Sequence, residues 1–211
     1  MADAIPGLLT TAPDLAAIVA PGWFTAAPVV VREREPRLDA PLSEAASRLR
    51  QTVEAAELTA AVRTMYKQVG LDPTKTRPSS EALLRRVKRG DELPRINSLV
   101  DVINWCSVET QLPFGLYDLD HVRGPVVLRL GLDDEGYAGI RKDTVRVGGR
   151  MTLADDLGPF GNPTSDSART MVTPATTRAL VVIFAPAGQS GAAARAVTLT
   201  RARIEQYGVR S

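Results

Sequence analysis

The sequence is poor in the side chains that most often carry chemistry. It contains one cysteine, Cys106, and one histidine, His121, in 211 residues. A single cysteine excludes an intrachain disulfide, and one cysteine with one histidine cannot supply the four ligands of a zinc site. The apolar neighbours of Cys106 indicate a buried thiol, and nothing in the sequence links it to His121 as a catalytic pair. We therefore expect no metal, no cofactor and no cysteine nucleophile.

Targeting and membrane signals are also missing. The first twenty residues contain Asp3 and Asp14, and they lack a basic start followed by an apolar run. No segment approaches the roughly 20 apolar residues of a membrane-spanning helix. These absences predict a cytoplasmic protein without a membrane partner. The net charge of +2 does not by itself indicate a nucleic-acid partner.

Length and composition are those of one ordinary globular domain. A chain of 211 residues, 44% of them hydrophobic, buries enough surface to fold without a disulfide or a metal. Aromatic residues make up only 5%, so the core must rest on Leu, Val, Ile and Ala. We predict an N-terminal extension of uncertain structure, residues 1–25, followed by a single domain, residues 26–211.

Helical spacing of apolar residues dominates the first half of the chain. It predicts four helices, at residues 43–56, 58–69, 79–89 and 96–108. Ser43 is the expected cap of the first helix, and Ser79 or Ser80 that of the third. Gly70 and Gly90 are placed to end the second and third helices.

Strand patterns dominate the second half. Runs of apolar and β-branched residues predict strands at residues 28–33, 126–130 and 178–186, and a hairpin around Gly148-Gly149. Residues 156–168 are expected to form a polar loop, and residues 191–207 a terminal amphipathic helix. Helices grouped early and strands late indicate an α+β fold, without βαβ alternation. No Walker loop, GxSxG elbow or dinucleotide fingerprint is present.

Residues 71–131 carry a series of motifs in a distinctive order. They read LDPTKTRPSSEALLRRV, then ELPRINSLVDVINWCSVETQLPFGLYDLDHVRG, then VVLRLG. This series resembles the editing domain, formed by modules B3 and B4, of the phenylalanyl-tRNA synthetase β subunit. The free-standing bacterial proteins that share this domain are more similar still. The string RPSSEALLRR is its most specific part, the firm match covers residues 60–131, and a looser one reaches the C-terminus.

The resemblance implies both a fold and an activity. The fold is α+β, with helices packed on a mixed or antiparallel sheet. The activity is hydrolysis of the ester between a tRNA 3′ end and a wrongly attached amino acid, so the implied partner is that aminoacylated 3′ end. Such domains hold the ester and a water rather than supply a covalent nucleophile. A sequence without a Ser–His–Asp or Cys–His set suits catalysis by positioning and electrostatics.

Site residues follow from the resemblance position by position. Asn104 stands where the family has an asparagine that lines the amino-acid pocket. Gly115, in PFGLYD, stands where the synthetase has a functional histidine, and the smaller residue makes room for a different ligand. The synthetase's substrate-reading glutamate has no counterpart, and the nearest acid is Asp166. Arg169 and Thr173, from the polar stretch 165–177, complete the expected pocket.

These segments are expected to meet on one concave surface: the helix with Asn104, the turn with Gly115 and the polar stretch 165–177. Alternatives stay open for each. The Asn104 amide can bind a ligand or backbone groups, and the polar stretch can bind a ligand or be solvated. Asp101 is expected to be a helix cap or an ion-pair partner, and Trp105 and Tyr117 to be core residues.

A basic stretch precedes this region. Between residues 61 and 95 there are nine Lys and Arg against four acids. Either the residues near the end of the predicted helix 79–89 complement the helix dipole, or they contact tRNA phosphates. An arginine of the pair at 85 and 86 could instead hold a substrate carboxylate. The candidates for tRNA contact are Arg77, Arg85, Arg86, Lys88 and Arg89.

The leading hypothesis is a deacylase that hydrolyses mischarged aminoacyl-tRNA in trans, without a catalytic side chain of its own. The alternative is a non-catalytic module that binds tRNA or an amino acid, which the replacement of the family histidine by Gly115 favours. A small-molecule hydrolase or lyase is a third possibility. The sequence does not predict the oligomeric state.

Overall fold

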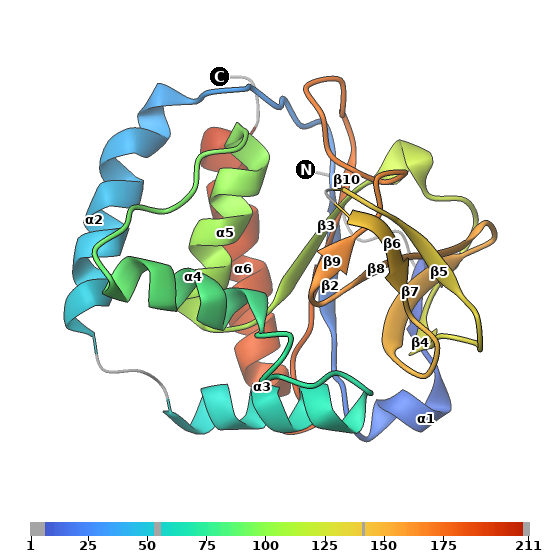
Figure 1. The fold of residues 1–211 in the computed structure, drawn as a ribbon. Coiled ribbons are helices and arrows are strands. Elements are labelled where there is room, and N and C mark those ends of the chain that lie inside the picture. The colour runs from blue at the N-terminus through green and yellow to red at the C-terminus, as the bar shows by residue number, and fades with distance from the viewer. Residues whose placement is uncertain (1–6, 53–55, 141, 209–211) are drawn as a thin grey trace.

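Helices and strands form separate halves of the molecule. The computed structural model describes residues 7–52, 56–140 and 142–208. Figure 1 shows most of the helices on one side and the strands on the other, so the α+β class is confirmed. The helices are α1 (Pro13–Ala16), α2 (Asp39–Gln51), α3 (Ala56–Gln68), α4 (Ser79–Lys88), α5 (Ser98–Thr110) and α6 (Ser190–Tyr207), with 3-10 turns at Pro36–Leu38, Leu119–His121 and Ala187–Gln189.

A three-stranded antiparallel sheet lies at the centre. Its order is β2 (Gly22–Ala26), β10 (Ala179–Ile183) and β3 (Phe114–Asp118). All five residues of β10 are buried, because this strand has a neighbour on each edge and is packed on both faces. The buried strand predicted for residues 178–186 is therefore confirmed. Its apolar run is what a strand covered on both faces requires.

A second, mixed sheet has five strands in the order β1 (Leu9–Thr11), β4 (Val126–Leu130), β7 (Met151–Asp155), β8 (Gly158–Asn162) and β9 (Ser165–Asp166). β1 runs parallel to β4, and the other pairs are antiparallel. Strands β5 (Gly136–Gly139) and β6 (Lys142–Arg146) form a hairpin. A bridge between Gly139 and Ser167 holds this hairpin beside β9.

Helices α5 and α6 pack side by side against the central sheet (Figure 1). Helix α6 approaches β2 closely because Gly22 faces Ala193 and Val197, and a Cβ at Gly22 would lie 3.0 Å from Val197. The guanidinium of Arg203 lies 3.5 Å from the centre of the Trp105 ring. Cys106 is fully buried, and burial raises the pKa of its thiol, as expected for a core cysteine.

The strand predicted at residues 28–33 is wrong. The strand in this region is β2, which ends at Ala26. Val29 and Val31 are buried, but the backbone N–H groups of Val29 and Val30 bond singly to Thr177 and Gly208 rather than to a neighbouring strand. Three consecutive valines therefore reflect burial of a connecting segment and not a ladder of strand hydrogen bonds.

Two predicted helix caps are also wrong. Helix α2 begins at Asp39, four residues before Ser43, and Pro41 fits within its first turn, where its missing N–H has no role. Pro78 precedes α4, and no side chain caps that helix. The helix predicted for 58–69 is confirmed as α3, and Gly70 follows it with φ of +76°. The helices predicted at residues 96–108 and 191–207 are confirmed as α5 and α6.

The region 142–168 differs most from expectation. The glycine pair 148–149 does not close a hairpin, because β6 pairs with β5 while β7 pairs with β4 and β8. Residues 156–168 are not a loop but contain β8 and β9. Strand β8, GPFGN, has two glycines and a proline and so gives no strand signal.

The N-terminal segment takes part in both sheets. β1 pairs with β4 and β2 pairs with β10, although both strands begin before residue 26. The boundary at residue 26 stays a prediction. Among the described residues, no helix is both long and apolar enough to cross a bilayer.

Candidate functional site

Two adjoining cavities lie between α5 and the strands. The larger has a volume of about 410 Å³ and is mostly apolar, and the smaller has a volume of about 220 Å³ and is lined mostly by polar residues. They share Ile103, Asn104, Phe114 and Asp166. The larger is also lined by Ile96, Asn97, Val100, Leu116, Ile140, Met171 and Val172, and the smaller by Ser79, Ser107, Asn162, Pro163, Thr164 and Ser165.

The three segments expected to converge do meet at these cavities. Asn104 comes from α5, Phe114 and Leu116 from β3, and Asp166 and Val172 from the late polar stretch. Asn104 and Asp166 line both cavities. The side-chain amide of Asn104 has no hydrogen-bond partner among the described residues, so it is available to a ligand.

One face of α5 forms a wall of the site. Asn97, Val100, Asn104 and Ser107 recur at helical spacing and all line a cavity. The side chain of Asn97 also caps α5 by accepting a hydrogen bond of 2.9 Å from the N–H of Val100. Sequence reasoning singled out Asn104 alone. The helix period would also have indicated the three other positions, which lie seven and four residues before Asn104 and three residues after it.

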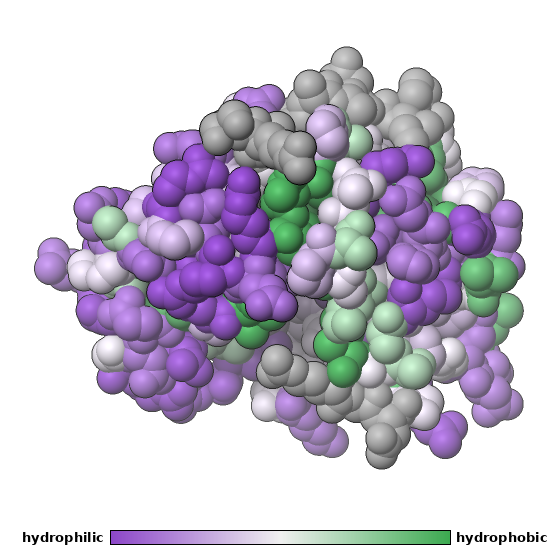
Figure 2. Space-filling view, turned by 90° about the horizontal axis from the view of Figure 1, so that it is seen from above, coloured by the Kyte–Doolittle hydropathy of each residue, from purple (hydrophilic) through white to green (hydrophobic). Residues whose placement is uncertain are grey.

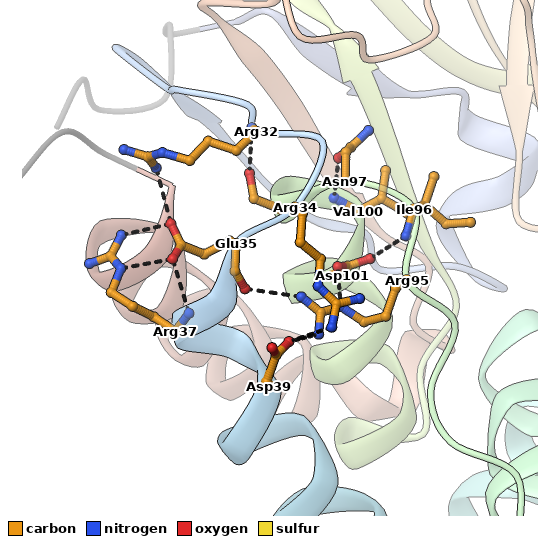
Figure 3. Close-up of polar contacts among 11 residues, drawn as sticks. Arg32, Arg34, Glu35, Arg37, Asp39, Arg95, Ile96, Asn97, Val100 and Asp101 are labelled. Atoms are coloured by element: carbon orange, nitrogen blue, oxygen red, sulfur yellow. Dashed lines mark hydrogen bonds and ion pairs between the residues drawn. The ribbon is translucent and has the colours of Figure 1, made fainter.

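A polar network fixes the N-terminus of α5 (Figure 3). The carboxylate of Asp101 accepts hydrogen bonds of 2.7 Å from the Arg95 guanidinium and 2.7 Å from the N–H of Ile96. Arg95 also donates to the Asp39 carboxylate and to the carbonyl of Glu35. Asp101 is thus an ion-pair partner, as predicted. Its bonds hold the backbone of Ile96, whose side chain lines the larger cavity.

Strand β3 alternates between the cavity and the protein interior. Phe114 and Leu116 line the larger cavity, whereas Gly115 and Tyr117, on the other face of the strand, line neither cavity. A Cβ at Gly115 would lie 2.2 Å from the Tyr117 hydroxyl oxygen. The expectation that glycine leaves room for a ligand is therefore wrong, because Tyr117 fills that space. Gly115 borders the site through its backbone only.

Asp166 is held in place by a tight turn between β8 and β9. The Asn162 side chain accepts hydrogen bonds from the N–H groups of Thr164 and Ser165, both at 2.9 Å. The Tyr137 hydroxyl donates to the carbonyl of Ser165, and the carbonyl of Asp166 accepts from the N–H of Ile140. These contacts fix the backbone from which the Asp166 carboxyl enters the cavities.

The Asp166 carboxyl lies beside two neutral phenols, those of Tyr117 and Tyr137, and is partly shielded from solvent. Its Oδ1 atom is shielded from solvent and has no hydrogen-bond donor. Burial raises the pKa of Asp166 to about 7, although the Tyr117 hydroxyl, which faces the carboxyl without forming a well-aligned hydrogen bond, opposes this shift. Burial also raises the pKa values of Tyr117 and Tyr137, so both phenols are neutral near pH 7.

Arg169 and Thr173 do not line either cavity. The Arg169 guanidinium forms a bidentate ion pair with the Asp155 carboxylate, with both N–O distances at 2.9 Å. The same guanidinium lies over the Phe160 ring. Thr173 forms a local turn, in which its N–H donates to the Thr176 hydroxyl at 3.0 Å. The described contacts of both residues are structural, and a role in substrate binding stays a prediction for them.

The predicted tRNA-binding residues lie on α4 and at its N-terminus. Arg77 pairs with Glu81, while Arg85, Arg86, Lys88 and Arg89 are exposed. Ser79 lines the smaller cavity at the other end of this helix. With a rise of about 1.5 Å per residue, the exposed cluster begins about 9 Å along the axis from Ser79. No arginine of this cluster lines a cavity, so none is placed to hold a substrate carboxylate there.

Apolar residues surround the larger cavity at the surface. Ile96, Ile140 and Met171 line it and are 46%, 44% and 37% exposed, and only two other large hydrophobic residues of the described chain are as exposed. Figure 2 shows apolar residues gathered across the centre of one face, between hydrophilic side chains. This rim was not predicted, because single exposed apolar residues give no signal in a sequence.

Asp166 is the only titratable side chain among the described residues that line the cavities. Within the described chain, no group of three or more His, Cys, Asp and Glu is placed to hold a metal ion. The hydroxyls of Ser79, Ser107 and Ser165 have no histidine beside them in the lining. The arrangement suits binding of a partly apolar ligand by two polar groups, an amide and a carboxyl.

Fold and site together define an α+β domain with two adjoining cavities between a helix and two sheets. Residues 61–205 match the model of the B3/4 domain family. Since this match covers more than half of the chain, the protein belongs to the B3/4 domain family.

The fold is also seen among solved structures. One of them is an N-terminal fragment of the phenylalanyl-tRNA synthetase β subunit from Pyrococcus horikoshii. The two superpose with a TM-score of 0.52 at 11% sequence identity, over 99% of this chain and 51% of that fragment. This chain therefore spans about half of the fragment, and at this identity the likeness concerns the fold alone. No curated protein sequence matches the chain.

Proposed function

We propose that this B3/4 domain protein hydrolyses mischarged aminoacyl-tRNA in trans. The observation that carries the proposal is the meeting of Asn104 and Asp166, 62 positions apart in the sequence, at the junction of an apolar and a polar cavity. The apolar cavity, at about 410 Å³, is large enough for an amino-acid side chain. The polar cavity beside it would take the ester and the terminal ribose.

Hydrolysis would depend on positioning. The Asn104 amide has free donors and acceptors with which to orient the ester or an attacking water. Apolar walls on one side of the ester exclude competing water, which strengthens the polar contacts within the site. Because the described lining holds no nucleophile activated by a base, water would attack the ester directly, and no acyl-enzyme would form.

The basic cluster of α4 would contact the tRNA backbone. Its exposed residues begin about 9 Å along the helix from the polar cavity. An acceptor stem that places its 3′ end at Ser79 would therefore bring phosphates near Arg85 and Arg89. Such contacts release counterions, so the affinity would fall steeply with salt.

The test is a deacylation assay with a panel of mischarged tRNAs. Loss of the labelled amino acid is followed with and without the protein, and the Asn104→Ala variant is compared with an Arg195→Ala control on the exposed face of α6. We expect ester loss above the spontaneous rate for at least one tRNA, and a large decrease with Asn104→Ala only. No turnover with any member of the panel would reject the proposal.

A non-catalytic module that binds tRNA or an amino acid is the second candidate. The filling of the Gly115 space by Tyr117 favours it, because the site lacks a histidine and the room for one. This candidate predicts saturable tRNA binding, or a thermal shift with an amino acid, without any loss of the ester. The deacylation assay and a binding isotherm on the same samples separate the two candidates.

A further inference from the structure

The charge inside the site is unbalanced. Of the described residues that line the two cavities, Asp166 alone is titratable, and none is a Lys, Arg or His. Its Oδ1 atom is shielded from solvent and accepts no well-aligned hydrogen bond from the described residues, although the neutral Tyr117 hydroxyl faces the carboxyl. A buried carboxylate without a donor or a counter-charge is unfavourable, and the balance is restored by a proton or by a cation that enters the site.

The position of this carboxyl matters as much as its unbalanced charge. Asp166 lines both the apolar and the polar cavity, as does Asn104 of α5. A ligand that reaches from one cavity into the other passes the residues that both cavities share, and Asp166 is the only titratable one among them. The group that meets Asp166 is therefore at the middle of the ligand, next to its apolar part on one side and its polar part on the other.

We infer that the paired cavities select α-amino acids whose amine is free and whose carboxyl group is blocked as an ester or amide. The α-ammonium group binds Asp166, the apolar side chain enters the larger cavity, and the acyl group with its alcohol or amine enters the smaller one. The inference rests on the proposed function for the identity of the ester.

The same charges argue against other ligands. A free amino acid brings a carboxylate, which would enter cavities without a described cation and would lie near the Asp166 carboxylate. An N-acylated amino acid ester has no ammonium group and leaves the buried carboxylate uncompensated. A ligand with one positive charge and no negative charge complements the described lining.

Calorimetric titration with small probes tests the inference without tRNA. The probes are L-phenylalaninamide and L-leucinamide, their N-acetyl derivatives, and free L-phenylalanine and L-leucine, all at pH 7.5. We expect at least one amide to bind at least tenfold more tightly than both its N-acetyl derivative and its free acid. In Asp166→Asn this preference is lost, and in the control Asp133→Asn, at an exposed turn, it is retained.

Asp166→Asn is first compared with the wild type by circular dichroism and thermal unfolding, so that a folding defect is not mistaken for lost binding. Equal affinity for the amides and their N-acetyl derivatives would overturn the inference. Tighter binding of both L-tyrosinamide and N-acetyl-L-tyrosinamide than of the phenylalanine and leucine amides would also overturn it. Asp166 would then bind a side-chain hydroxyl rather than an ammonium group.

The outcome is separable from the proposed function. If the protein hydrolyses mischarged tRNA but does not bind the amides more tightly than their N-acetyl derivatives and free acids, the proposed deacylation is supported and the ammonium site at Asp166 is rejected. If the amides bind as expected but no tRNA is hydrolysed, the ammonium site at Asp166 is supported and the protein is a binding module.

Discussion

The hydroxyl of Tyr117 occupies the space that a side chain at Gly115 would need. A Cβ at Gly115 would lie 2.2 Å from this hydroxyl oxygen, and a Cβ at Gly161 would lie 2.4 Å from it. Gly115 belongs to the central sheet and Gly161 to the five-stranded sheet, so the Tyr117 ring is held between the two sheets. It also contacts Phe160 edge-on, with ring centroids 5.0 Å apart. The two glycines allow the phenol to face Asp166.

Gly115→Ala should destabilise the fold. The added methyl group would overlap the fully buried Tyr117 ring, and neither can move without displacing a sheet. Overpacking of this kind costs about 1–3 kcal/mol. The measurement is the free energy of unfolding in urea, and Gly188→Ala, where nothing lies within 4 Å of the new methyl group, is the control. Equal stability of the two variants would contradict the contact between Tyr117 and Gly115.

Asp166 should make the fold less stable as the pH rises from about 4 to about 7. The pKa of Asp166 is about 7 in the folded chain against an ordinary 3.8, so in this interval the folded state holds a proton that the unfolded state has released. The free energy of unfolding then falls with pH, by about 1.4 kcal/mol for each unit of pKa difference between the two states. Since Asp166 lines open cavities, the observed fall will be smaller than the full difference gives.

The comparison with Asp166→Asn isolates this effect. Urea unfolding of both proteins between pH 4.5 and pH 8 should show a wild-type stability that falls relative to the variant up to about pH 7 and then levels off. Carboxylates with lowered pKa values, such as Glu35 and Glu81, affect both proteins alike and at lower pH. The groups that face Asp166, Tyr117 from β3 and Tyr137 from β5, stay neutral throughout. Parallel curves would show that Asp166 is ordinarily solvated.

The fold class and most helices could be predicted from the sequence because apolar spacing records which face is buried. α5 and α6 were found this way, as was β10. The strand β8 could not be found, since Gly161 is required by the Tyr117 ring, a contact made across two sheets. Likewise, Gly149 does not close a hairpin, and its carbonyl oxygen instead packs on Gly70, where a Cβ would lie 2.3 Å from it. Contacts between residues far apart in the sequence determine the structure of these segments.

The candidate site was predictable by segment but not by side chain. Asn104 and Asp166 line the cavities. Gly115 does not, because neighbouring residues of a strand lie on opposite faces, and Arg169 does not, because it forms an ion pair with Asp155. An arginine in a polar stretch gives no sign of whether it faces a ligand or a buried carboxylate. The partner of Arg169, Asp155, is 14 positions away, and the pairing of β7 with β8 and of β8 with β9 brings the two segments close together.

Arg169→Ala should therefore lower stability and leave ligand binding unchanged. The Asp155 side chain is fully buried and would lose both of its charged donors, although it keeps bonds from the N–H groups of Arg123 and Leu157. The loss of a buried partner of this type costs about 1–3 kcal/mol. Thermal unfolding measures it, with Arg178→Ala, in the exposed pair with Asp120, as the control. A weaker affinity for L-phenylalaninamide or L-leucinamide with unchanged stability would instead assign Arg169 to the ligand.

Asp101→Ala should destabilise α5 and disturb the larger cavity. The residue is 1% exposed and its loss leaves the Ile96 N–H and one side of Arg95 unpaired, which costs about 1–3 kcal/mol. Asp39→Ala removes the other carboxylate that pairs with Arg95, but that side chain is 48% exposed and its loss should have a much smaller effect. Urea unfolding compares the two variants. Equal effects would show that the network at the α5 N-terminus is solvated.

Arg85→Ala should weaken tRNA binding and reduce its dependence on salt. Arg85 is exposed and has no partner among the described residues, unlike Arg86, which donates to the carbonyl of Glu92 at 2.9 Å. Removal of one phosphate contact lowers the slope of log K against log salt by about 1. Filter binding of tRNA at several salt concentrations measures the slope, and Arg195→Ala on α6 is the control. If the slope is unchanged and only the stability of α4 decreases, then Arg85 serves the helix dipole and the tRNA approaches the cavities from another side.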